Sequence, residues 1–313
     1  MASSGDLEFG YHLPRYDRYD DPTAWRDLAR AAERVGFDTV WRDDHVAIPT
    51  DLRYEDYQFG VPDWARGPTP YCDVFTALAH VAGATDRVGV GTNVCVVPYR
   101  HPLVLAKQAL SLVALTDGRF EFGVGVGWLR SEFDALDVPF AERGSRTDEF
   151  LDLFDRALAD GEVALDGPHH TFEEVSLRPI PEPDGRPRIW VGGRSGAAMR
   201  RVARAGDGWT IVATPPSGVA DARDRLEEAW AAHDRAGTPP IAVRHGVRFA
   251  AGTDHEATDG TTTVGSVDDV VRTVEAYVEA GATHVTMRSP CTDFDTERAQ
   301  LERFGEEVIP AFA

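Results

Sequence analysis

The chain has 313 residues, 42% of them hydrophobic, and carries a formal net charge of −20 at pH 7. This length can bury a full core in one large α/β barrel or in two smaller domains, and the acidic charge disfavours binding to nucleic acid. No apolar run could span a membrane, the first residues show no secretory signal, and the three separated cysteines form no CxxC pair, so we expect a cytoplasmic protein without a metal site.

Apolar runs of strand length alternate along the chain with amphipathic segments of helix length. The predicted strands are, in chain order, 7–13, 37–41, 87–97, 119–126, 188–193, 208–212, 242–250 and 283–287. Each is followed by a predicted helix, which favours parallel pairing. Eight such units predict a closed (β/α)8 TIM barrel formed as a single domain by residues 1–313.

An open, doubly wound sheet is the competing architecture for alternating strands and helices. The glycine fingerprint G-x-G-x-x-G of dinucleotide-binding sheets is incomplete here, because after Gly125 and Gly127 the last position is Arg130. This departure favours the barrel. The proline-rich segment 162–187 is predicted to be a hairpin or loop inserted between the fourth and fifth units.

The fourth predicted strand contains an unusual run of glycines. Gly123, Gly125 and Gly127 alternate with Val124 and Val126, so one face of the strand lacks side chains. Such a face indicates that something approaches the backbone closely. A ligand at the barrel mouth and the packing of a crowded barrel interior are the two explanations, and the second suits the deeper Gly123.

The segment "WRDDH" follows the second predicted strand, at the end of the barrel where ligands gather in this fold. Asp44 and His45 there could move protons. The cluster Asp43, Asp44 and His45 could alternatively bind a metal in a hydrolase, although no HxH pair supports this. A polar turn with a surface histidine is the structural alternative.

The segment "VGGRSG" follows the fifth predicted strand and opens a predicted helix. Free N–H groups at a helix start attract anions, and Gly193 lets a phosphate approach while Arg194 and Ser195 add a charge and a hydroxyl. A tight turn in which Ser195 caps the helix explains the same residues equally well.

Two further segments have polar or aromatic character. We interpret His169 and His170 in the insertion as solvent-exposed and without a role, and 142–150 as a helix start with paired charges. The long segment 43–70 is predicted to cover the site. Its aromatic residues, which suggest a partly apolar substrate or packing onto the barrel, are Tyr54, Tyr57, Phe59 and Trp64.

Several blocks, taken in their order and spacing, resemble the bacterial luciferase-like superfamily, and within it the oxidoreductases that depend on deazaflavin. They are "ERVGFDTVWRDDH", "GVGTNVCVVPYRHPLVLAKQALSL", "GRFEFGVGVGWLRSEFDAL", "ERGSRTDE", "IWVGG" and "GDGW". The resemblance extends from about residue 7 to residue 215. It implies a (β/α)8 barrel that binds FMN or coenzyme F420.

The resemblance also implies positions for the cofactor. A non-prolyl cis peptide that backs the ring would join Asn93 and Val94, and the phosphate-binding turn would be Gly193, Arg194 and Ser195. A ring held there would lie against Gly125, Gly127 and Trp128.

Two departures from the family pattern narrow the expected activity. Trp128 stands where the sugar-phosphate dehydrogenases carry a catalytic glutamate, so sugar-phosphate oxidation is disfavoured. Val126 stands where luciferase has an arginine for the FMN phosphate, which favours F420.

These residues lead us to expect hydride transfer between F420 and a small organic substrate. His45, oriented by Asp44, would exchange the accompanying proton. The alternatives are an FMN-dependent monooxygenase served by a separate reductase, a non-catalytic flavin-binding barrel and a metal-dependent hydrolase. Family resemblance implies a homodimer or a higher homo-oligomer.

Overall fold

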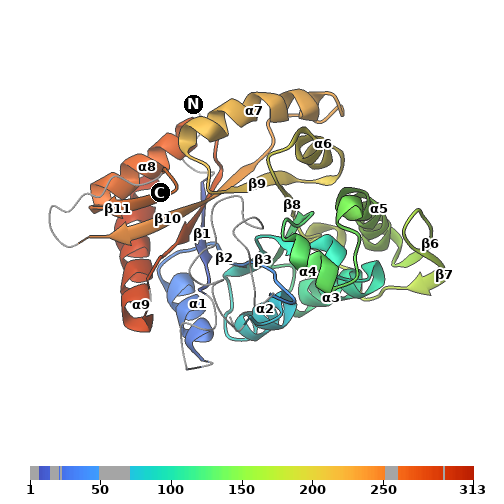
Figure 1. Cartoon of the computed structure of the whole chain (residues 1–313). Helices are drawn as coiled ribbons and strands as arrows, with labels where there is room; N and C mark the ends of the chain where they lie inside the picture. The colour runs from blue at the N-terminus through green and yellow to red at the C-terminus, as the bar shows by residue number, and fades with distance from the viewer. Residues whose placement is uncertain (1–6, 15–20, 22, 49–70, 251–259, 292) are drawn as a thin grey trace.

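Eight parallel strands close into a barrel in which the order around the barrel follows the order along the chain. The computed structural model describes residues 7–14, 21, 23–48, 71–250, 260–291 and 293–313 (Figure 1). Its barrel strands are β1 (Glu8–His12), β2 (Thr39–Arg42), β3 (Gly89–Thr92), β5 (Phe120–Gly125), β8 (Ile189–Gly192), β9 (Gly208–Val212), β10 (Ile241–Phe249) and β12 (His284–Arg288).

Closure of the barrel is visible in the pairing of its last strands with its first. β12 pairs in parallel with β1, for example at Val285 and Phe9, and β9 pairs with β10. The predicted (β/α)8 barrel is therefore confirmed. One parallel strand was not predicted: β11 (Thr262–Gly265) extends the sheet beside β10.

Helices surround the barrel and cover its outer face with apolar side chains. They are α1 (Ala24–Arg34), α2 (Val74–Ala82), α3 (Pro102–Leu115), α4 (Arg130–Ala135), α5 (Arg143–Asp160), α6 (Gly196–Ala205), α7 (Pro216–Ala231), α8 (Val267–Glu279) and α9 (Phe294–Arg303). Side-chain caps fix where several of them begin. The carboxylate of Asp73 caps α2, and Ser266 and Asp269 form a reciprocal capping box on α8.

The third predicted strand is interrupted where the structure needs a bend. β3 ends at Thr92, and the short strand β4 (Cys95–Val96) then pairs with β5. The Asn93–Val94 peptide bond between them is cis. Residues 87–97 are thus two short strands around a kink rather than one continuous strand.

The insertion forms an antiparallel hairpin of β6 (Glu162–Asp166) and β7 (Thr171–Ser176). It follows α5 in the chain, lies between the fourth and fifth barrel strands, and projects from the right-hand side of Figure 1. Successive side chains of a strand point to opposite faces, so the apolar Val163 and Leu165 of β6 pack inward while their neighbours are exposed.

Two tryptophans occupy the barrel interior. Trp41 and Trp190 form a small buried cluster with Ala242, separate from the core between strands and helices. Gly91 lies opposite Trp41, and a Cβ on this glycine would stand 2.4 Å from the indole ring. Glycine in these strands therefore makes room for large side chains inside the barrel.

Candidate functional site

His45 and Glu132 form a buried pair at the C-terminal end of the barrel. His45 follows β2, and its Nδ1 lies 2.8 Å from Oε2 of Glu132 in α4. The hydroxyl of Tyr99 donates to the same oxygen at 2.8 Å, and the N–H groups of Val46 and Ala47 donate to the other. A carboxylate with four donors is fixed in place and in turn fixes the imidazole.

The environment of this pair favours its charged form. Burial alone would lower the pKa of His45, but the hydrogen bond to Glu132 and the negative charges of Glu132, Asp43 and Asp44 raise it above its ordinary value. Burial would likewise raise the pKa of Glu132, yet His45 and the N–H donors lower it. An imidazolium beside a carboxylate at the barrel mouth can hold a proton and deliver it.

Asp44 does not orient His45, and this prediction is wrong. The two oxygens of Asp44 accept from Arg100 at 2.6 Å and 2.9 Å, and Oδ2 also accepts from the N–H of Val96. Side chains of neighbouring residues in an extended segment point in opposite directions, so Asp44 turns toward Arg100 while His45 turns toward Glu132. Asp44 holds the chain after the cis peptide in position.

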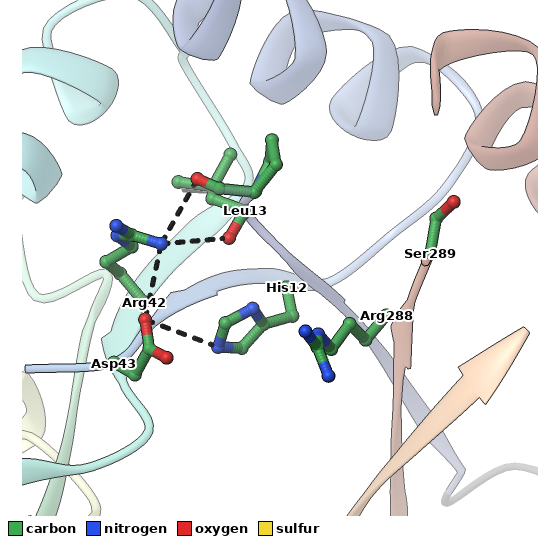
Figure 2. Close-up of a pocket in the computed structure, with 7 residues that line it drawn as sticks. His12, Leu13, Arg42, Asp43, Arg288 and Ser289 are labelled. Carbon is green, nitrogen blue, oxygen red and sulfur yellow. Dashed lines mark hydrogen bonds and ion pairs between the residues drawn. The ribbon is translucent and has the colours of Figure 1, made fainter. Parts of the chain in front are cut away.

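Asp43 belongs to a third group of contacts, of which Figure 2 shows those with Arg42 and His12. It accepts a hydrogen bond from the hydroxyl of Tyr71 and forms an ion pair with Arg42. The three residues proposed as a metal cluster thus face three different partners. Among the residues that the structure describes, no group of three His, Cys, Asp or Glu side chains could hold a metal ion.

The glycine face of β5 is filled by the protein itself. A Cβ on Gly125 would stand 2.6 Å from Cγ2 of Val94, and a Cβ on Gly127 would stand 2.6 Å from Cγ1 of Val96. Gly123 faces the carbonyl of Thr92 even more closely, at 1.9 Å. The missing side chains are explained by the kinked third strand, and contact of Gly125 and Gly127 with a cofactor stays a prediction.

Asn93 lies in this kink and has a side-chain oxygen that accepts no hydrogen bond from the described residues. Its Nδ2 donates to the hydroxyl of Thr210 at 3.2 Å, whereas its buried Oδ1 has no hydrogen-bond partner within the described ranges. A buried acceptor of this kind is unfavourable unless a ligand or a water satisfies it. Asn93 therefore offers a hydrogen-bond acceptor to a ligand at the mouth.

Trp128 follows β5 at the rim of the barrel, where it was expected. The residue is 38% exposed, and its ring centroid lies 6.1 Å from that of His45 in an edge-on arrangement. Trp128 is thus an apolar wall beside the His45–Glu132 pair. The contact of Trp128 with a cofactor stays a prediction.

The turn after β8 contains the glycine conformation and the helix cap that the sequence predicts. Gly193 has φ of +118°, a conformation that favours glycine, and the Oγ of Ser195 accepts from the N–H of Ala198 at the start of α6. Arg194 is exposed and donates to the carbonyl groups of Val212 and Ala213. Ser195 is thus a helix cap, and the binding of an anion at this turn stays a prediction.

The prediction that His169 and His170 of the insertion are solvent-exposed and without a role is wrong. Nδ1 of His170 lies 2.6 Å from Oε1 of the buried Glu149, and Nε2 of His169 lies 2.8 Å from the hydroxyl of Ser145. These contacts fasten the hairpin to α5. The predicted ion pair at the start of that helix is present, between Arg146 and Glu142 at 2.8 Å. The aromatic residues of 54–64 lie outside the described residues.

Comparison with known proteins identifies the family. The family model described as "Luciferase-like monooxygenase" matches residues 8–259. The chain belongs to this family. An uncharacterized protein of Mycobacterium tuberculosis, Rv0940c, is 34% identical to this luciferase-like chain over 193 residues. That alignment covers 60% of this chain and 65% of the relative, so it spans less than two thirds of the relative's length.

Solved structures share the fold of this luciferase-like chain. Monooxygenase RslO1 from Streptomyces bottropensis has a TM-score of 0.81 at 21% identity, covering 98% of this chain and 100% of its own. The coenzyme F420 dependent tetrahydromethanopterin reductase from Methanopyrus kandleri has a TM-score of 0.78 at 18% identity, covering 99% and 100%. At such identities the likeness shows the fold alone. No helix in the described part of the chain is both long and apolar enough to cross a membrane.

Proposed function

We propose that this luciferase-like protein is an oxidoreductase that transfers a hydride between coenzyme F420 and a small organic substrate. The observation that carries the proposal is the buried His45–Glu132 pair at the C-terminal end of the barrel. Proteins with this fold include the coenzyme F420 dependent tetrahydromethanopterin reductase from Methanopyrus kandleri. We further propose that the protein works in the cytoplasm as a homodimer or higher homo-oligomer.

The residues at the barrel mouth fit a planar, phosphate-carrying cofactor. The unpaired Oδ1 of Asn93 can accept a hydrogen bond from a ring N–H, which both F420 and FMN possess. The turn of Gly193, Arg194 and Ser195 would hold the phosphate through its N–H groups. Val126, where luciferase has its phosphate-binding arginine, favours F420 over FMN.

The chain's own residues then have separate tasks. When bound, the deazaflavin supplies two electrons as a hydride. His45 gives or takes the accompanying proton at the ring nitrogen that does not face Glu132, and Glu132 keeps the imidazole charged and in one orientation. Trp128 excludes water from one side of the imidazole.

An FMN-dependent monooxygenase with a separate reductase is the second candidate. Its support is the fold shared with the monooxygenase RslO1, and the His45–Glu132 pair could move protons in that reaction too. Anaerobic titration with reduced F420 and with reduced FMN, each followed by admission of oxygen, separates the candidates. Oxygen-dependent product formed only with FMN would replace the F420 proposal.

The proposal is tested with F420 and a panel of small alcohols, aldehydes and ketones, by following the visible absorbance of the deazaflavin. We expect wild type to turn over at least one member, and His45→Gln to bind F420 normally while losing roughly 100-fold or more in rate. Tight F420 binding with no turnover of any compound would instead favour a non-catalytic binding barrel. An undiminished rate in His45→Gln would remove the role of His45.

A further inference from the structure

A second polar cluster, distinct from the His45–Glu132 pair, surrounds a small pocket at the barrel mouth. The pocket is lined at the ends of β1, β2 and β12 by His12, Arg42, Asp43 and Arg288, among others (Figure 2). Its free volume is about 10 Å³. This is about the space that a single water-sized group occupies.

The pocket carries an excess of positive charge in a strongly acidic protein. Arg42 and Arg288 line it, and Arg244 donates to Nε2 of His12 at 2.9 Å. Burial and the charges of these arginines hold the pKa of His12 well below its ordinary value, so this imidazole is neutral. Among the described residues, two guanidinium groups therefore line the pocket and a third contacts its His12, against the one lining carboxylate, that of Asp43.

Several of the guanidinium donors in this cluster are not used. Arg42 is fully buried, and only its Nη1 makes hydrogen bonds, to the carbonyl groups of Leu13 and Pro14. Its Nε and Nη2 have no hydrogen-bond partner among the described residues, although the guanidinium lies over the rings of Tyr71 and Trp25. Arg288 makes no hydrogen bond or ion pair with any residue in the described part of the chain. Charged donors near or in a buried site are costly to leave unpaired, which favours binding of an anion.

Tyr71 connects the pocket to the candidate catalytic pair. Its hydroxyl donates to Asp43 of the pocket, and its ring centroid lies 5.2 Å from that of His45. A small molecule with one end in the pocket would therefore extend toward His45. The cluster is placed to select a substrate as well as to hold it.

We propose that this pocket, which we call the arginine pocket (His12, Arg42, Asp43, Arg288), binds a singly charged oxyanion, a carboxylate or a sulfonate, at one end of the substrate. One anion oxygen fills the pocket and accepts from Arg288, while the remainder of the substrate lies in the barrel mouth. As a statement about the substrate, this inference rests on the proposed function. The binding of an anion by the arginine pocket does not depend on the proposed function.

The test uses the full chain without cofactor, so its result is independent of the hydride-transfer proposal. Binding of sodium acetate and of sodium methanesulfonate is measured by titration calorimetry or anion NMR at constant ionic strength. Acetamide serves as a neutral probe of similar shape, and inorganic phosphate as a larger and more highly charged one. We expect saturable binding of one or both monoanions, none of acetamide, and weaker binding of phosphate.

Variants assign the binding to the arginine pocket. Arg288→Gln is expected to weaken anion binding by about tenfold or more, and Arg288→Lys to retain part of it because the charge remains. Arg298→Gln, on the outer helix α9, is the matched control and is expected to bind like wild type. Thermal unfolding of each variant verifies that it is folded.

Three results would overturn the inference. They are the absence of saturable binding of either monoanion to wild type, equal binding by wild type and folded Arg288→Gln, and preferential binding of phosphate that is lost in folded Arg288→Gln. If F420-dependent turnover is also found, Arg288→Gln should raise KM for anionic substrates more than it lowers kcat. Anion binding without F420 turnover would keep the pocket and remove only the proposed reaction.

Discussion

Nδ1 of His45 lies 2.8 Å from Oε2 of Glu132, and both side chains are buried although 86 residues separate them in the chain. The same carboxylate accepts from the hydroxyl of Tyr99 and from two N–H groups after β2. Glu132 therefore joins α4, the segment after β4 and the loop after β2 around one imidazole. This arrangement makes Glu132 a positioning residue for His45.

Replacing Glu132 with glutamine tests this positioning role. Glu132→Gln keeps the shape of the side chain but removes the charge that raises the pKa of His45, so the midpoint of the His45 titration should fall. The measurement is the NMR titration of the His45 ring, and Glu142→Gln, at the half-buried glutamate that pairs with Arg146, is the control. An unchanged midpoint in folded Glu132→Gln would contradict the role.

The pair should also make stability depend on pH in a defined window. Because the folded-state pKa of His45 is raised, its contribution is complete below the ordinary value of 6.5 and is lost as pH rises through the folded value. Because that of Glu132 is lowered, its contribution is complete above 4.5 and is lost as pH falls through the folded value. Wild type should therefore exceed His45→Gln in free energy of unfolding most between about pH 4.5 and 6.5.

Urea unfolding of both proteins across pH provides the measurement. The difference between wild type and His45→Gln should shrink toward pH 9 and toward pH 3. A difference that grows steadily from neutral to alkaline pH would show that His45 is buried neutral rather than as an imidazolium.

Asp44 should matter for stability rather than for proton transfer. Its side chain is fully buried in a two-pronged ion pair with Arg100, so Asp44→Asn removes the buried one of the two carboxylates that pair with this guanidinium, and leaves it only the more exposed Asp73. We expect a loss of about 3 kcal/mol or more in the free energy of unfolding, with a small change in the His45 titration. A stable Asp44→Asn protein with a strongly shifted His45 midpoint would reverse these assignments.

The close contact between Gly125 of β5 and Val94 can be tested with a pair of variants. Gly125→Ala places a methyl 2.6 Å from Cγ2 of Val94 and should destabilise the protein by about 1–3 kcal/mol. Val94→Ala in the same chain removes the clashing methyl, so the double variant should lose less than the sum of the two single losses. Additive losses in denaturant unfolding would show that Val94 is not what Gly125 accommodates.

Much of the fold could be predicted because apolar periodicity is a local property. Each barrel strand was predicted near its observed position. The kink at Asn93 and the added strand β11 could not be read from periodicity, because both depend on what packs against them. The segment of Glu162–Asp166 and Thr171–Ser176 was recognised as an insertion from its composition.

The candidate site was only half predictable. His45 stood out because it follows a strand at the ligand-binding end of the barrel. Glu132 did not, because an acidic residue in a short helix is ordinarily exposed, and only the fold shows that it is buried. The neighbouring Phe133, fully buried in the same helix, was the available signal that this helix packs inward. Arg42 and Arg288 meet at one pocket from two strands that are distant in sequence.

The most direct test of the central claim compares the affinities of F420 and FMN for wild type and for Ser195→Asp. Aspartate also caps helices well, so the variant should stay folded while its charge repels the cofactor phosphate. The account predicts that wild type binds F420 more tightly than FMN, and that Ser195→Asp weakens F420 binding by about tenfold or more. Tighter binding of FMN, or equal F420 affinity in folded Ser195→Asp, would contradict it.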